Sequence, residues 1–176
     1  MGIITAGAMI RALSLFHMTL AVVLVRSPQL IANQSIVIVL GQSMQLPTPR
    51  EFLAPSASIA FLGVLFAFLG LSDLTAISMS EELADEYWGI QTPIRLLFLF
   101  ALTGYTYVFK EGGMVAPRSS DWMMGKGNVT LNNSIVFTWG FLEMAAWFWV
   151  FVTLREERRE KAKKIIEKRQ AEAARL

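Results

Sequence analysis

The sequence contains no cysteine and only one histidine, His17, among its 176 residues. Without cysteine the chain forms no disulfide, no thiolate metal site and no cysteine nucleophile. One histidine cannot form a histidine cluster for a metal, and phosphate-binding glycine loops, metalloprotease motifs and nucleophile elbows are absent as well. We therefore expect no metal and no cofactor. These absences favour a protein that is not an enzyme, without deciding the question.

Charged residues are scarce too, at 17% of the chain, whereas 54% of the residues are apolar. So large an apolar share exceeds what one soluble core can bury and indicates an integral membrane protein. A helix that crosses a bilayer needs about 20 mostly apolar residues. Four windows qualify and predict an all-α membrane protein with a four-helix transmembrane bundle: about 3–25, 55–78, 90–109 and 133–154.

Positive charge is concentrated at the C-terminus, where residues 155–176 hold nine of the 16 Lys and Arg residues. Because positive charge favours the cytoplasmic side, we expect both termini of a four-span chain to be cytoplasmic. The transmembrane domain is then 1–154, and 155–176 forms a charged helical tail supported by i,i+4 pairs such as Glu157–Lys161. The tail is either a solvated stalk that touches anionic headgroups or a docking helix for a partner. Its interspersed glutamates argue against nucleic acid as that partner.

The first connection on the far, lumenal side contains the run IVIVLG, which is apolar but too short to cross. We expect a short interfacial or re-entrant helix here, beginning near Pro28 and ending by Pro47. An apolar loop packed over the bundle is the alternative. Three N-x-[ST] sequons fall in the two far-side loops and are candidate glycosylation sites. Their asparagines are Asn33, Asn128 and Asn132.

Polar residues interrupt the first and fourth predicted spans. Arg11, Ser14 and His17 are spaced i, i+3, i+6 and share an arc of about 120° on a helix. Glu143 lies near the centre of the fourth span, where a charge costs about 2.5–3.5 kcal/mol on insertion scales. We predict that Glu143 meets Arg11 or His17, in a cluster that contacts a lipid or a partner. Alternatively, the pair only fixes helix register, or Arg11 reaches the interface while Glu143 is protonated.

Three further features concern the second and third spans. Asp73 is expected to be hydrated near the cytoplasmic rim, with membership of the polar cluster as the alternative. Arg95, at the start of the third span, is expected to reach lipid phosphate. Small residues on one face of the second span predict close packing against a neighbouring helix of this chain or a partner. They are Ser56, Ala60, Gly63, Ala67 and Gly70.

Three segments carry a family resemblance: SLFHMTLA, SPQLIANQSIVIVLGQSMQLP and the second span with its small residues. Together they resemble the fungal family named for increased loss of mitochondrial DNA, which consists of small multi-pass membrane proteins. The likeness extends from about residue 8 through the fourth span. It implies an endoplasmic reticulum membrane protein that supports mitochondrial DNA maintenance and has no established enzymatic activity. No functional residue can be carried over from the family.

Two functions remain open. The first is a non-enzymatic accessory or scaffold subunit of a protein complex in the endoplasmic reticulum membrane, with other membrane-protein subunits as partners. The second is a small lipid-binding or lipid-modifying protein that uses the intramembrane Arg/His/Glu cluster. An ion pathway ranks last, because four helices with this many aromatic residues leave little space for a pore.

Overall fold

The computed structural model describes residues 4–109 and 131–174, and every regular element among them is helical. Four helices are long: α1 (Ala6–Arg26), α4 (Ala57–Ile77), α5 (Glu81–Val108) and α6 (Ser134–Ala173). Three short elements connect α1 to α4: α2 (Gln29–Ala32), α3 (Ser35–Ser43) and the 3₁₀ helix η1 (Arg50–Leu53). The predicted all-α class is therefore confirmed for the part of the chain that is described.

Three of the long helices follow residues whose side chains bind free backbone N–H groups of the first turn. The side chains of Thr5, Ser56 and Asn133 each accept a hydrogen bond from the first turn of α1, α4 and α6, respectively. These three helices are also long and apolar enough to cross a membrane. α5 is not among them, because acidic residues occupy its first two turns and Arg95 interrupts the apolar run that follows. A crossing by α5 stays a prediction.

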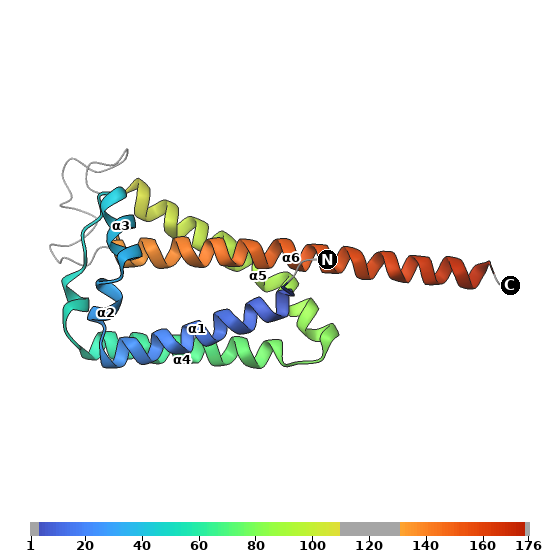
Figure 1. The fold of residues 1–176 in the computed structure, drawn as a ribbon, viewed down its shortest axis with the longest axis horizontal. Helices are drawn as coiled ribbons and strands as arrows, with labels where there is room; N and C mark the ends of the chain where they lie inside the picture. The colour runs from blue at the N-terminus through green and yellow to red at the C-terminus, as the bar shows by residue number, and fades with distance from the viewer. Residues whose placement is uncertain (1–3, 110–130, 175–176) are drawn as a thin grey trace, which may run out of the picture.

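The long helices form two pairs, α1 with α4 and α5 with α6 (Figure 1). Gly63 and Gly70 of α4 are buried against α1, and a Cβ atom at Gly70 would lie only 2.7 Å from the backbone oxygen of Ser14. The small residues thus bring two helices of the same chain together. Ser56 and Ala67 are exposed, so these two members of the predicted packing face lie outside that contact.

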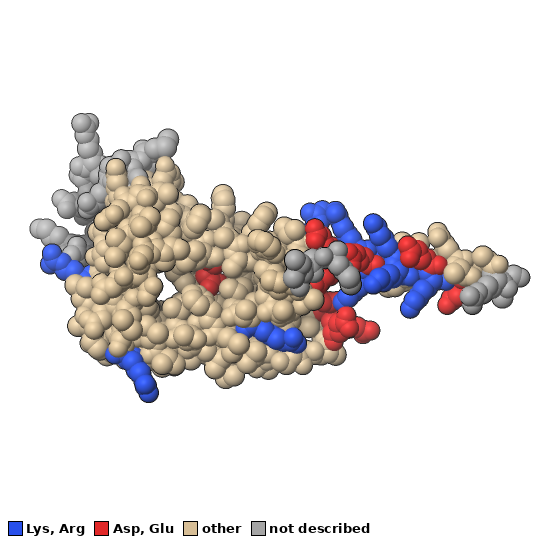
Figure 2. Space-filling view, viewed as in Figure 1, with Lys and Arg blue, Asp and Glu red and all other residues tan. Residues whose placement is uncertain are grey.

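The N-terminal end of α1, the α4–α5 connection and the charged half of α6 lie at the same end of the bundle (Figure 1). The backbone N–H of Ala6 donates to Glu157 Oε1 at 3.0 Å, which joins the start of α1 to α6. Beyond this point α6 continues as one helix and projects from the bundle. Charged side chains gather along this projection, whereas the visible face of the bundle carries few (Figure 2).

The short helices cover the opposite end of the bundle. Pro28 precedes the first turn of α2, and Asn33 and Gln34 separate α2 from α3. Gly41 of α3 is buried against Ser134, whose backbone N–H donates to the Pro47 carbonyl at 3.0 Å. A helix therefore forms from the IVIVLG run and packs on the start of α6. Its interfacial or re-entrant position in a membrane stays a prediction.

Candidate functional site

The carboxylate of Glu143 is the centre of a buried polar cluster. Glu143 Oε1 lies 2.7 Å from His17 Nε2, and the two side chains are only 4% and 1% exposed. The indole of Trp147 donates to the second oxygen, Oε2, at 2.9 Å. Both carboxylate oxygens therefore have partners, as a buried carboxylate requires. His17 comes from α1 and Glu143 from α6, so the pair links the two helix pairs.

Arg11 lies outside this cluster. The guanidinium-bearing side chain is exposed and forms no ion pair with any residue that the structure describes. Ser14 is buried, but its hydroxyl donates to the Ile10 carbonyl at 2.8 Å within the same helix. The predicted arc is wide enough that its first member points outward while its last member faces α6. Of the two basic partners expected for Glu143, only His17 contacts it.

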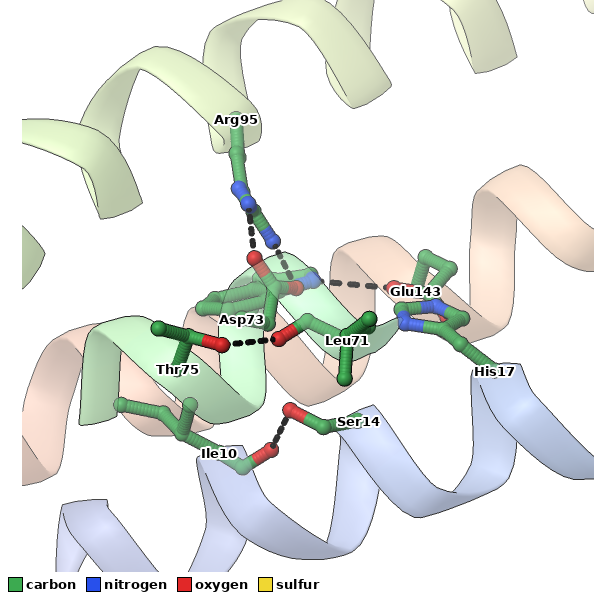
Figure 3. A network of polar contacts seen from close by, with 9 residues as sticks. Ile10, Ser14, His17, Leu71, Asp73, Thr75, Arg95 and Glu143 are labelled. Atoms are coloured by element: carbon green, nitrogen blue, oxygen red, sulfur yellow. Dashed lines mark hydrogen bonds and ion pairs between the residues drawn. The ribbon is translucent and has the colours of Figure 1, made fainter. Parts of the chain in front are cut away.

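Asp73 and Arg95 form a second ion pair (Figure 3), in which the carboxylate is buried and the guanidinium is half-buried. Arg95 Nη1 and Nη2 donate to the two Asp73 oxygens at 2.6 and 2.5 Å, a two-bond geometry suited to arginine. Asp73 is 1% exposed and the Arg95 side chain is 16% exposed. The expectations of a hydrated Asp73 and of an Arg95 that reaches lipid phosphate are therefore wrong.

Arg95 reaches Asp73 rather than lipid phosphate because α5 is longer than its apolar window. The helix begins at Glu81 rather than near residue 90, so Arg95 lies about four turns inside it, level with the last turns of α4. Opposite charges in two consecutive helices joined by a short connection are the sequence signal for such a pair. Taken singly, each of the two charges instead indicates a place at the membrane interface.

Two tryptophans connect the ion pairs. The Arg95 guanidinium carbon lies 4.6 Å from the ring centre of Trp147 and 5.3 Å from that of Trp88, within the range of cation–π attraction. The two indole rings stack at 5.5 Å. Trp147 thus contacts Arg95 with its ring and Glu143 with its N–H. We call His17, Asp73, Arg95, Glu143 and Trp147 the polar cluster; its members come from all four long helices.

A cavity of about 320 Å³ lies beside the polar cluster. Its polar wall is formed by His17, Gln91, Arg95 and Glu143, together with Trp139 and Trp147. A hollow is visible between the two helix pairs, with an acidic side chain at its wall (Figure 2). The cavity volume of about 320 Å³ falls at the lower end of the range of ligand pockets, about 300–1,000 Å³. No group of three or more His, Cys, Asp or Glu side chains suited to a metal occurs within residues 4–109 and 131–174.

A second set of ion pairs surrounds the base of the projecting helix. Lys161 Nζ donates to Glu81 Oε1 at 2.6 Å and to Asp85 Oδ2 at 2.5 Å, and Arg158 donates to the Asp85 carbonyl. The hydrogen bonds to Asp85 and Glu81 raise the pKa of the Lys161 ammonium above its ordinary 10.5. We call Glu81, Asp85, Glu157, Arg158 and Lys161 the collar, because they hold α6 to the start of α5 and α1.

The candidate glycosylation sites have different surroundings. Asn33 is exposed at the end of α2. Asn132 is half-buried, and its amide donates to the Phe109 carbonyl at 2.6 Å. Asn128 lies outside the described residues. Glycosylation at these positions stays a prediction.

These features define a helical membrane protein with a charged cluster buried between its helices. Its sequence matches the profile of the family described as "Increased loss of mitochondrial DNA protein 1" over residues 4–164. The chain belongs to this family, which confirms the resemblance drawn from its sequence. The family's name connects it with mitochondrial DNA maintenance.

Two curated fungal relatives agree. Protein ilm1 of Schizosaccharomyces pombe is 29% identical over 132 residues, covering 75% of this chain and 70% of the relative. Protein ILM1 of Saccharomyces cerevisiae is 26% identical over 150 residues, covering 85% of this chain and 64% of the relative. No solved structure matches the chain.

Proposed function

We propose that the protein is a non-enzymatic accessory subunit of a protein assembly in the endoplasmic reticulum membrane, and that it supports mitochondrial DNA maintenance indirectly through this assembly. The observation that carries the proposal is the projecting part of α6. Residues 162–173, which we call the arm, are helical and exposed at every position. An exposed helix held in a fixed direction is suited to docking a partner.

The collar fixes that direction. Glu157 receives the α1 N–H, Arg158 reaches the backbone of α5, and Lys161 bridges two α5 carboxylates. Surface ion pairs contribute little singly, about 0–1 kcal/mol, but several around one turn restrict how the helix leaves the bundle. A partner would therefore meet a preoriented helix and lose less entropy on binding.

The arm also carries two exposed apolar side chains among its charged residues. Ile165 and Ile166 are 53% and 55% exposed and adjacent, with lysines before them and Glu167 after them. Apolar side chains surrounded by charged ones are the pattern of an interface core with a polar rim. The partner that this pattern fits is a protein with an apolar groove on its cytoplasmic side, rather than a nucleic acid, which would favour an unbroken basic stripe.

Affinity purification in mild detergent tests the proposal. The wild-type chain, an Ile165→Glu/Ile166→Glu double variant and an Ala171→Glu control would be purified in parallel from the native host. We expect a defined membrane protein in near-equimolar amount with wild type and with the control, and its loss from the double variant. The mitochondrial to nuclear DNA ratio, measured by quantitative PCR, should fall only in cells that carry the double variant. Equal recovery from all three chains would contradict docking through the arm.

A further inference from the structure

We infer that the cavity beside the polar cluster is a binding site for a glycerolipid, which it holds through the lipid's ester carbonyl groups. The inference does not depend on the arm or its partner, because the cavity lies within the bundle. Its location between two helix pairs is the first observation. The pairs pack closely within themselves but meet sparsely, and α4 touches α5 little.

The second observation is the combination of polar wall and apolar entrance. His17, Gln91, Arg95 and Glu143 form the polar wall. Ile94 and Phe98 also line the cavity and are 56% and 63% exposed, so they lie at its entrance. An apolar entrance that faces the hydrocarbon of a bilayer is a poor path for water. An amphiphile matches both parts, because its polar group can reach the wall while its chains remain among the apolar side chains of α4 and α5.

The third observation is that the wall offers unused hydrogen-bond donors. Among the residues described, His17 Nδ1 and Trp139 Nε1 are buried without a partner, and both side chains line the cavity. The indole N–H is a donor only. Arg95 has five N–H groups, of which the Asp73 pair uses two, so three remain. Buried donors without partners are costly, which favours an acceptor supplied from outside the chain.

His17 Nδ1 is buried and has no partner among the described residues, whereas Nε2 faces Glu143. A histidine ring that carries a hydrogen on Nδ1 would offer that N–H to an acceptor in the cavity.

The charges of the wall are already paired, which favours a neutral ligand. Arg95, the one Lys or Arg among the described residues that line the cavity, already has Asp73 as its counter-charge, and both Glu143 oxygens are bonded to protein groups. An anion would bring an unbalanced charge into the membrane, whereas a neutral acceptor adds none. Ester carbonyls are neutral acceptors, occur in pairs at the head of every glycerolipid, and are attached to acyl chains. They satisfy the wall and the entrance together.

The test is native mass spectrometry of the full chain, delipidated in mild detergent and titrated with dioleoylglycerol, dioleoylphosphatidylcholine or inorganic phosphate. We expect one molecule of either lipid per chain and no retained phosphate. Binding of phosphatidylcholine alone would mean that the headgroup is recognised, and binding of phosphate would mean an anion site. Either result would overturn the inference, as would the absence of a one-to-one lipid complex.

Three variants locate the site. Trp139→Phe keeps the ring but removes one unpartnered N–H, and should weaken binding about fivefold, the loss of one net hydrogen bond. Trp149→Phe is the matched control, because Trp149 is 65% exposed and does not line the cavity. Ile94→Trp should abolish binding by filling the entrance at an exposed position where folding tolerates a larger side chain. Equal lipid affinity of wild type, Trp139→Phe and Ile94→Trp would overturn the assignment.

Discussion

Replacing Asp73 by Asn should destabilise the protein strongly, because it leaves the Arg95 guanidinium without its counter-charge. Removal of one partner from a buried ion pair costs about 3–5 kcal/mol. Arg95 is 16% exposed, lines the cavity and keeps its contacts with two indole rings, so we expect a cost near the lower end, about 3 kcal/mol. Arg95→Gln should cost at least as much, because Asp73 is 1% exposed.

The double variant separates this ion pair from general disturbance. With both charges removed, neither side chain is an isolated ion, so Asp73→Asn/Arg95→Gln should be less destabilised than the sum of the single variants by at least about 1.5 kcal/mol. The free energy of unfolding can be measured by circular dichroism as the SDS fraction in mixed micelles rises. Arg11→Gln is the control for loss of an exposed arginine. Neutral hydrogen bonds in membranes average only about 0.6 kcal/mol, so a coupling energy of about 1.5 kcal/mol or more indicates an ion pair. If the double variant loses as much stability as the two single variants together, the ion pair is refuted.

Three further predictions concern packing, the histidine pair and the collar. Gly70→Ala should cost about 1–3 kcal/mol of unfolding free energy, because the new Cβ would meet the α1 backbone at 2.7 Å. Gly104→Ala is the control for the same SDS titration and should cost nothing, because nothing lies within 4 Å of its Cβ. Glu143→Leu should cost at least about 2 kcal/mol, because it leaves His17 Nε2 and the Trp147 N–H without their partner. Glu143→Gln can still bond both groups and should cost less. Equal losses in the two variants would contradict the pairing. Lys161→Gln should raise amide hydrogen exchange in the arm at pH 7. This difference should vanish as pH rises through the raised pKa of Lys161, because the stabilisation is fully present below 10.5 and is lost once the folded ammonium deprotonates.

The class of fold could be predicted from the sequence because hydrocarbon imposes a simple requirement. Long apolar runs bounded by capping residues form helices, and α1, α4 and α6 follow that rule closely. The start of α5 could not be placed in this way. Its first turns, EELADE, are too acidic for a span, yet they are strong helix formers and extend the helix outside the apolar window.

The polar cluster was predictable only in part. Glu143 required a partner because of its depth, and the helical spacing of the first span offered His17. Sequence alone could not choose between Arg11 and His17, because both lie on one broad arc and the crossing of α1 with α6 decides which one faces inward. The Asp73–Arg95 pair does not follow from the apolar windows, because the position of Arg95 relative to α4 depends on where α5 begins. The cavity depends on how far the helix pairs separate, which no local pattern encodes.

The unbroken course of α6 has a mechanical consequence. The helix runs without interruption from Glu143 in the polar cluster to the isoleucines of the arm, a span of about 35 Å at 1.5 Å per residue. As a stiff rod it converts a tilt of about 5° at the cluster into a sideways shift of about 3 Å at Ile166. A change in the packing of α6 at the cluster that also shifts the collar would therefore move the isoleucines of the arm.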